Sequence, residues 1–509
     1  MKRREFFAAA SSMMLPVMVN GFGVKAMAED SAFVRSLLKT TAAYSDRILV
    51  VIYLDGGNDG LNTVIPKDQY SAYNALRGNI GIPENRILSL SNNDKMGFHP
   101  AMTGMQNLYN EGKLAVVHSV AYPNPSKSHY RSTDIYMTAV DHNQYADTGW
   151  AGRYLLKRYP GYPEEYPKPE MTDPLAIEIG SLARISSFGS RQPMAVSIQN
   201  PTAMAGMLDT QDPSYSGEVP CCQSGDLIKF VRQQQTLAVD YASRIKRAAE
   251  IGRNMSTYPT TPASMTELSE QLKVVSRLID GGLQSKIYFV SLSGFDTHAE
   301  QVSGSDTTTG LHATLLKKLS ESISAFQNDL RLQGREDKVI GMTFSDFGRR
   351  ATSNASKGTD HGVGAPMFVF GTGIKRQEIG TNPDLTNGLL PVAPQAWDRD
   401  RDVAMQIDFR RVYGDILNDW FGTNNATTDA VLFKNFSTIS LFSEIVETIA
   451  SGFWSDKRIW STGIVPSSKE YVKINSGHTV RVNSVISVKN IQMDGDLIFD
   501  GLFDVNISG

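Results

Sequence analysis

Aspartate, histidine and hydroxyl side chains follow directly on several apolar segments of the chain, and these side chains can bind metal ions or hydrolyse esters. The first group follows the apolar segment 48–54, where Asp55 and Asp59 lie in the glycine-rich stretch Leu54–Asn62. This stretch lacks the Lys-Ser/Thr ending of a phosphate-binding P-loop, and its glycines do not fit a dinucleotide-binding motif. Loops of this composition are also common as plain turns, so the motif alone leaves both interpretations open.

A hydroxyl group and a histidine follow a second apolar segment, 114–121, in the stretch Ser126–Arg131. Ser128 directly precedes a helical pattern that begins at His129. A serine at this position commonly caps the helix. It can also place its hydroxyl near helix N–H groups that stabilise an anionic ester. The residues themselves do not decide between a cap and a nucleophile.

Aspartate and histidine recur together after two later apolar segments. Asp296 and His298 follow the first of these, and Asp346 follows the second, with Asp360 and His361 beyond a polar loop. Two of the eight histidines therefore lie beside aspartates in glycine-flanked loops, which is a stronger signal than any single Asp-x-His. Aspartate and histidine without cysteine are ligands for zinc, manganese, magnesium or calcium. The sequence therefore predicts a divalent metal as cofactor.

The apolar segments before these loops have the composition of strands buried on both faces, because they are rich in Val, Ile, Leu and Phe without strict alternation. The predicted strands are Ile48–Leu54, Leu114–Ala121, Leu175–Ile179, Ile287–Leu292, Val339–Phe344 and Met367–Phe370. The predicted helices are Pro100–Asn110, His129–Ala139, Leu227–Ile251, Ser264–Leu278, Leu311–Leu332 and Phe409–Phe421. This alternation predicts an α/β fold, a mostly parallel sheet sandwiched by helices. Parallel strands end at one edge of a sheet, so the Asp, His and Ser groups are expected to converge there.

Residues 1–28 have the pattern of an export signal. Arg3 and Arg4 precede an apolar stretch, and Ala26–Ala28 supplies a small-x-small cleavage site. The arginine pair followed by x-Phe-Phe resembles the twin-arginine signal, which implies the twin-arginine translocase as a partner and the periplasm or cell surface as the location. An amphipathic first helix is the alternative, and Pro16 argues against it.

The mature chain is expected to comprise an α/β domain at 29–466 and a β-rich appendage at 467–509, where short alternating strands suggest the stub of a β-solenoid. A Pro-, Gly-, Tyr- and Ser-rich insertion around 141–225 is predicted to form loops or a cap.

A net charge of −3 without a basic cluster gives no reason to expect a nucleic-acid partner. No apolar run after the signal is long enough for a membrane span.

The motifs, in their order along the chain, resemble the domain-of-unknown-function family numbered 1501. The matching stretches lie between about residues 48 and 375: LDGGNDGLNTVIP, FHPAM, KSHY, TGWAGR, GFDTHAEQ, SDFGR and GTDHG. Members of this family carry twin-arginine signals and are placed in the alkaline-phosphatase/sulfatase superfamily. The resemblance therefore implies an alkaline-phosphatase-like fold with a small C-terminal β appendage.

The superfamily pattern also implies roles for particular residues. Its first metal-binding aspartate corresponds to Asp55 or Asp59, and its nucleophile corresponds to Ser128. The Asp and His that hold one metal correspond to Asp296 and His298.

The next superfamily pair is Asp-His, but here Asp346 is followed by Phe347. His361 would supply the last histidine, with Asp360 assisting or orienting it. The missing histidine implies that the site holds a single metal or is degenerate. His129 is expected to be a ligand or a proton donor.

In an active site of this kind, Arg131 or Arg349 would hold the oxygens of the substrate. The combined interpretation is an exported metal-dependent hydrolase of phosphate or sulfate esters, with Ser128 as nucleophile and a small molecule or polysaccharide as the ester. The alternative is a non-catalytic periplasmic or cell-surface binding or assembly protein that retains the fold. Phe347 and the β appendage favour this alternative, whereas the clustered Asp and His loops favour the enzyme.

Overall fold

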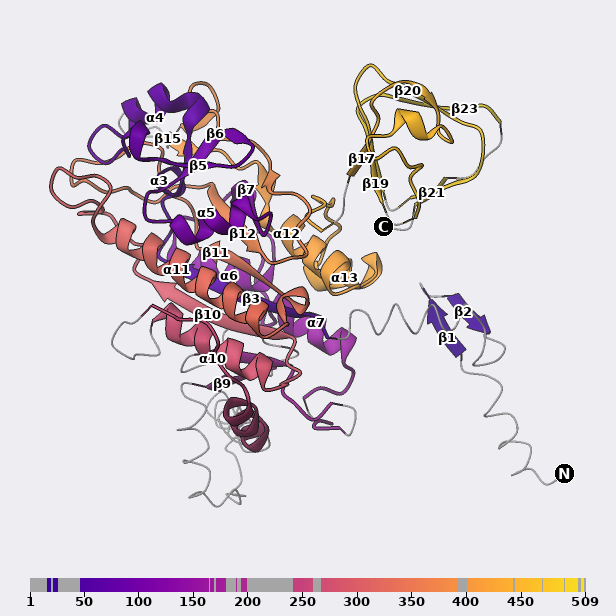
Figure 1. Ribbon diagram of the computed structural model, residues 1–509, viewed down its shortest axis with the longest axis horizontal. Helices are drawn as coiled ribbons and strands as arrows, with labels where there is room; N and C mark the ends of the chain where they lie inside the picture. The colour runs from indigo at the N-terminus through magenta and orange to yellow at the C-terminus, as the bar shows by residue number, and fades with distance from the viewer. Residues whose placement is uncertain are drawn as a thin grey trace.

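The structure is a computed structural model of the 509-residue chain (Figure 1). It describes residues 16–19, 22–25, 46–163, 165–168, 171–179, 189, 194–198, 241–259, 267–391, 401–442, 445–468, 470–488, 490–501 and 505–507. Most of the predicted signal and much of the 141–225 insertion, with Cys221 and Cys222, lie outside these residues. Within the signal region, β1 (Pro16–Val19) pairs antiparallel with β2 (Phe22–Lys25).

A large β-sheet forms the centre of the molecule and confirms the predicted α/β class. Its strand order is β13-β7-β12-β11-β3-β10-β8-β9, and β16 pairs with β7 outside this path. The main strands are β3 (Ile48–Asp55), β7 (Leu114–Ala121), β8 (Ala176–Ile179), β9 (Ala195–Ile198), β10 (Ile287–Ser293), β11 (Val339–Ser345) and β12 (Ala365–Phe370). The predicted strands match these closely, because continuous apolar runs are what a strand buried on both faces requires.

One predicted strand runs against the expected direction. β12 contains the predicted strand Met367–Phe370, but it pairs antiparallel with both β11 and β7. The reason is the connection from β11, since residues 346–364 contain no crossover helix that would return the chain to the opposite edge. The segment stays at the carboxyl edge, and β12 begins there and runs back. β3, β7, β10 and β11 still end at the same edge.

Helices cover both faces of the sheet (Figure 1). α5 (Thr103–Asn110), α10 (Leu268–Asp280) and α11 (Leu311–Leu332) lie in front in this view. α6 (His129–Thr138), α7 (Trp150–Arg158) and α12 (Phe409–Asp415) lie behind, followed by the π-helix Ile416–Trp420 and α13 (Asn425–Leu432). Tyr136 of α6 contacts Phe344 of β11 and Phe409 of α12, with ring centroids 5.7 and 4.3 Å apart, which fixes α6 against the sheet. No helix among the described residues has the length and apolar character needed to cross a membrane.

Short elements surround the sheet. β4 (Val64–Pro66), β5 (Leu88–Leu90) and β6 (Asn93–Phe98) form a small antiparallel sheet next to α3 (Gly60–Thr63) and α4 (Tyr70–Leu76). The remaining short strands are β13 (Glu378–Ile379), β14 (Leu389–Pro391), β15 (Arg401–Val403) and β16 (Ile407–Asp408). The 3-10 helices are Lys67–Gln69, Glu84–Arg86, Glu336–Lys338 and Lys457–Ile459.

The C-terminal strands form a separate unit, here called the β-module (residues 445–507), seen in yellow in Figure 1. Its strands are β17 (Ile445–Glu447), β18 (Gly452–Phe453), β19 (Tyr471–Ile474), β20 (Thr479–Val482), β21 (Ile486–Val488), β22 (Asn490–Met493), β23 (Asp496–Phe499) and β24 (Val505–Ile507). Strands from successive turns of the chain pair in parallel, as in a β-solenoid. The apolar core of the β-module includes Val446 and Trp454, so the unit contains residues before position 467, where the appendage was expected to begin.

Candidate metal centre

The loop after β3 needs glycine at its start because another loop passes directly over it. Gly56 and Gly57 have φ values of +117° and +81°, in the left-handed region that glycine adopts readily. A Cβ atom on Gly56 would lie 2.4 Å from the backbone nitrogen of Asp296. The two glycines therefore allow the loop after β10 to bring Asp296 against the end of β3.

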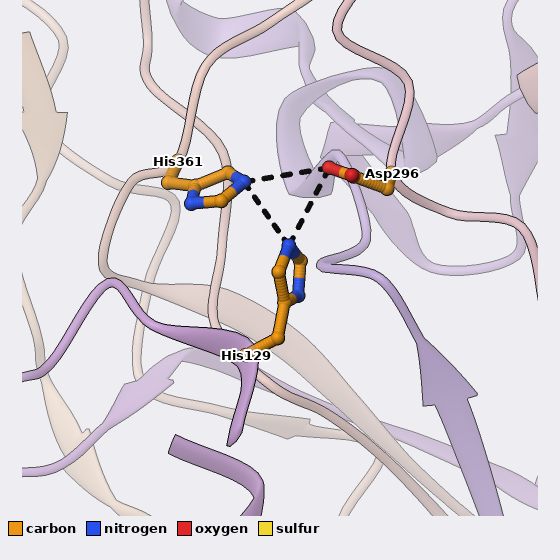
Figure 2. Close-up of side chains that lie close together, drawn as sticks. All are labelled: His129, Asp296 and His361. Atoms are coloured by element: carbon orange, nitrogen blue, oxygen red, sulfur yellow. Dashed lines mark hydrogen bonds and ion pairs between the residues drawn. The ribbon is translucent and has the colours of Figure 1, made fainter. Parts of the chain in front are cut away.

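Three side chains from distant segments converge at the carboxyl edge of the sheet. His129 is the first residue of α6, Asp296 follows β10, and His361 lies in the loop between β11 and β12. Their Nε2, Oδ1 and Nε2 atoms point toward one another in Figure 2. The distances are 3.1 Å from His129 to His361, 3.4 Å from His361 to Asp296 and 3.6 Å from His129 to Asp296. Ligands in a tetrahedron around zinc lie ~3.3 Å apart, given bond lengths of about 2.0–2.1 Å.

His298 lies beside this group and is a fourth candidate ligand. Its Nε2 atom is 2.8 Å from Nε2 of His361 and 3.2 Å from Oδ1 of Asp296. The imidazole is partly exposed. The site can therefore offer three imidazole nitrogens and one carboxylate oxygen, or a smaller set that leaves one position open for water or substrate.

Each of the three histidines has a hydrogen-bond acceptor at its other ring nitrogen. Nδ1 of His129 lies 2.5 Å from Oδ2 of the buried Asp346, and Nδ1 of His298 lies 3.1 Å from Oδ1 of Asp360. Nδ1 of His361 lies 2.8 Å from the backbone carbonyl oxygen of Lys127. Carboxylates and carbonyls accept hydrogen bonds, so each Nδ1 carries the proton and donates it.

The assignment of these protons determines what the Nε2 atoms can do. A neutral imidazole that donates from Nδ1 has only a lone pair at Nε2, so the facing Nε2 atoms cannot hydrogen-bond with one another. A cation at the converging atoms of His129, Asp296 and His361 satisfies the lone pairs of His129 and His361. Histidines whose Nδ1–H is held by a carboxylate or carbonyl are typical of metal ligands, because this contact fixes the tautomer and the ring orientation. The donor set therefore fits a divalent metal.

The surroundings of His361 and Asp296 shift the pKa of both side chains downward. Burial lowers the pKa of His361, and the positive charge of Arg349 lowers it further, although the hydrogen bond to the Lys127 carbonyl opposes the shift. Burial alone would raise the pKa of Asp296, but the hydrogen bond and charge of Arg349 bring it below its usual value. The lower pKa values favour the neutral imidazole of His361 and the charged carboxylate of Asp296, the protonation states in which these side chains bind a metal.

Phe347, the residue that departs from the superfamily pattern, forms the wall behind two of the histidines. Its ring centroid lies 4.7 Å from that of His129 and 4.5 Å from that of His361. Phe347 is buried, so it holds the two imidazoles in place from the protein side.

The structure gives two of the predicted ligands a different contact. Asp346 and Asp360 accept hydrogen bonds from His129 and His298 and contribute no oxygen to the converging atoms. Asp360 was expected to assist or orient His361, but it contacts His298. Burial would raise the pKa of Asp360, yet the hydrogen bonds from His298 and Asn354 bring it below its usual value.

The two aspartates of the first loop lie outside the converging group. Asp55 accepts a hydrogen bond of 3.1 Å from the Tyr53 hydroxyl. Asp59 is fully buried and forms a two-pronged ion pair with Arg77, at 2.6 and 2.8 Å. Both oxygens of the Asp59 carboxylate therefore face the guanidinium, and Gln301 donates to one of them as well. Asp59, one of the two alternatives expected for the first ligand, is not among the converging side chains.

Neither arginine predicted to hold substrate oxygens is free to do so. Buried Arg349 donates to the backbone carbonyls of Gly56, Gly57 and Thr359, and its Nη2 lies 2.6 Å from Oδ1 of Asp296. These bonds tie three loops together and orient Asp296. Arg349 is thus a positioning residue for the site.

Arg131 also makes its guanidinium contacts away from the converging side chains. It pairs with Asp134 one turn along α6 and donates to the backbone carbonyls of residues 141, 142 and 144. Its guanidinium lies 4.0 Å from the centroid of the Tyr145 ring. Arg131 therefore fixes the loop after α6.

Ser128 is the N-cap residue of α6, but its side chain makes no capping hydrogen bond. The residue is exposed, and its hydroxyl has no hydrogen-bond partner among the residues that the structure describes. The Ser128 hydroxyl therefore does not form the helix cap that the sequence allowed as one interpretation.

One contributor to the site had no signal in the sequence. The backbone carbonyl of Lys127 orients His361, and any residue type can supply such an oxygen. Only the fold shows that this carbonyl faces residue 361.

Comparison with protein families supports the resemblance found in the motifs. Residues 229–432 match the model of a family described as "Protein of unknown function (DUF1501)". The matched range contains Asp296, His298, Asp346 and His361. No curated protein sequence matches the chain.

Several solved structures are similar to this one at low identity. The structure of Ps i-CgsB with k-i-k-neocarrahexaose has 8% identity and a TM-score of 0.34, covering 77% of this chain and 73% of that one. An alkaline phosphatase superfamily protein from Vibrio parahaemolyticus has 10% identity and a TM-score of 0.31, with coverage of 66% and 63%. The PsFucS1 sulfatase from Pseudoalteromonas sp. has 13% identity and a TM-score of 0.30, with coverage of 71% and 70%. Likeness at this level transfers no activity to this chain.

Proposed function

We propose that this protein is a metal-dependent hydrolase of phosphate or sulfate esters with one metal centre, formed by His129, Asp296, His361 and His298. The observation that supports the proposal is the convergence of Nε2 and Oδ1 atoms within 2.8–3.6 Å of their neighbours, with every Nδ1 held by an acceptor. Three imidazoles favour zinc, or another imidazole-binding transition metal such as iron, over calcium, magnesium and manganese, which prefer oxygen ligands.

A bound metal would act as a Lewis acid and lower the pKa of a coordinated hydroxyl or water. Ser128 is the proposed nucleophile, because its hydroxyl lies free at the start of α6, next to His129 in the chain. The N–H groups of the first turn of α6 would stabilise negative charge on the ester. Arg349 would keep Asp296 ionised and oriented. The ester class rests on the resemblance of the motifs to the alkaline-phosphatase/sulfatase superfamily.

Metal analysis of the purified protein, combined with a panel of aryl phosphate and aryl sulfate esters, tests this function. We expect about one equivalent of a transition metal per chain, and slow turnover of at least one ester. Ser128→Ala should keep the metal and remove turnover, whereas His361→Ala should remove both. Tyr130→Phe, which removes an exposed hydroxyl two residues beyond Ser128 on α6, is a matched control.

Metal binding without turnover of any ester would favour the alternative function, a non-catalytic binding or assembly protein with the same fold. Absence of a stoichiometric metal in protein purified without chelator would contradict the metal centre itself.

We also propose that the protein is exported through the twin-arginine pathway, on the basis of residues 1–28 alone. Replacing both Arg3 and Arg4 by lysine should leave an uncleaved precursor in the cytoplasm. Fractionation of cells that express the two versions measures this, and unchanged delivery of the variant to the periplasm would contradict the proposal.

A further inference from the structure

A crevice of about 430 Å³ with a mixed polar and apolar lining lies between the α/β domain and the β-module. Its walls include Arg376, Arg411, Ser437, Thr438, Tyr471 and Ile491. Small-molecule sites commonly have volumes of roughly 300–1,000 Å³ and often lie at domain interfaces. The crevice has the size and the location of such a site.

The two arginines that line the crevice donate only to backbone oxygens. Arg411 donates from Nε to the carbonyl of Ser437 at 3.0 Å and from Nη2 to the carbonyl of Thr438 at 3.2 Å. Arg376 donates from Nη1 to the carbonyl of Ile439 at 2.9 Å. A guanidinium has five N–H donors, so both side chains keep donors for another partner.

No carboxylate neutralises either guanidinium within the part of the chain that the structure describes. The negative groups that act on Arg376 are Asp415 and Glu447, and neither forms an ion pair with it. The Asp415 oxygens already accept from Thr438, Ile439 and Leu441. Glu447 accepts from the Asn475 side chain. Asp415 and Glu447 thus partly offset the charge of Arg376 without a direct ion pair to it among the described residues.

We propose that this crevice is a second binding site, for a tetrahedral oxyanion such as phosphate or sulfate. Arg376 and Arg411 both line the crevice and keep unused donors, and arginine is the side chain that recognises phosphate and sulfate through planar pairs of N–H groups. Ser437 is exposed at the crevice and can add a hydroxyl donor. The bound group is either a free anion or a charged substituent on a polymer, and both present the same oxygens.

Isothermal titration of the full-length protein tests the site. The Asp296→Ala/His361→Ala variant is used as the background, so that oxyanions cannot bind through the metal centre. Inorganic phosphate, inorganic sulfate and dextran sulfate are titrated separately. Saturable binding of an inorganic anion identifies a free-anion site, and binding of dextran sulfate alone identifies a polymer-borne group.

Two variants in the crevice and one outside it make the result specific. Arg376→Gln/Arg411→Gln and, separately, Ser437→Glu should each weaken binding by about tenfold or more, because they remove donors or add a competing carboxylate. Arg458→Gln removes a charge from an exposed arginine of the β-module and should leave the affinity unchanged. If the double arginine variant does not fold, the affinity of the Ser437→Glu variant for the anion tests the site instead. Absence of saturable anion binding, or equal affinity in Ser437→Glu, would overturn the proposal.

Discussion

The metal centre and the buried cluster around Asp59 both combine Asp and His, and the segment after β10 contributes Asp296 to one and Gln301 to the other, yet they differ in chemistry. In the buried cluster, Asp59 is paired with Arg77 and accepts a hydrogen bond of 2.6 Å from Gln301. His312 there contacts the Asn58 side chain at 3.1 Å. Burial lowers the pKa of His312 to about 4, so this histidine is neutral at neutral pH.

In the metal centre, by contrast, the Asp296 side chain is half exposed, and the histidines direct lone pairs at one another. The difference lies in the partners. A guanidinium neutralises Asp59 completely within the protein, whereas the converging Nε2 atoms leave room for a cation. Both aspartates meet a buried arginine, but Arg77 engages both oxygens of Asp59, whereas Arg349 contacts Asp296 at Oδ1 and leaves that side chain half exposed beside the Nε2 atoms.

The largest expected effect is on the buried cluster. Arg77→Ala leaves the carboxylate of Asp59 buried without a counter-charge, and it should lower the free energy of unfolding by about 3–5 kcal/mol. Chemical denaturation measures this change. Arg458→Ala, in an exposed pair with Asp456, should leave the stability unchanged. Equal stabilities of Arg77→Ala and the wild type would show that the buried pair has no structural role.

The second prediction distinguishes the metal centre from the buried cluster by the metal content of their variants. His361→Ala should abolish stoichiometric metal binding, because it removes the nitrogen that lies nearest to both other histidines. At a metal concentration 100 times Kd, bound metal should contribute about 2.7 kcal/mol to the free energy of unfolding of the wild type. A chelator should remove this contribution from the wild type and leave the stability of the variant unchanged. His312→Ala, in the buried cluster, should keep its metal. Loss of metal in His312→Ala with retention in His361→Ala would reverse the assignment.

A smaller effect concerns the acceptors behind the histidines. Asp346→Asn weakens the acceptor that orients His129, and the affinity for metal should fall by roughly 10–100-fold. Asp360→Asn should have a weaker effect, because Asp360 is more exposed than Asp346 and water can replace it. Competition with a chromophoric chelator measures both affinities. An affinity loss in Asp360→Asn that exceeds the loss in Asp346→Asn would contradict this ranking.

The smallest effect is a pH dependence of the buried cluster. Burial would raise the pKa of Asp59, but the charge and hydrogen bonds of Arg77, with further contributions from His312 and Gln301, bring it below the usual 3.8. The unfolded chain therefore binds a proton at higher pH than the folded chain. Stability from this group is complete above about pH 4 and is lost as the pH falls through the native pKa. Asp59→Asn should reduce the slope of the unfolding free energy against pH below 4, and an unchanged slope would contradict the prediction.

The sequence predicted the framework of the site well. The strands before each motif were placed within one or two residues for β3, β7, β10 and β11, because a strand buried on both faces leaves a continuous apolar run. It also indicated Asp296, His298 and His361 as candidate ligands. The direction of β12 was not predicted, since it depends on where the 346–364 segment lies in space.

By itself the sequence determined the residue types, their places at strand ends and the α/β class, because these depend on local pattern and composition. The tertiary structure decided which group each side chain faces. Asp59 and Asp296 are the same residue type in similar strand-end loops, but Asp59 meets Arg77 alone among charged side chains of its cluster, whereas Asp296 meets Arg349 and three histidines. Asp346 and the carbonyl of Lys127 orient ligands because segments more than two hundred residues apart in the chain meet at one edge of the sheet. Such contacts depend on long-range packing, and the physical role of an ionisable group is set by the charges and acceptors within hydrogen-bond distance of it.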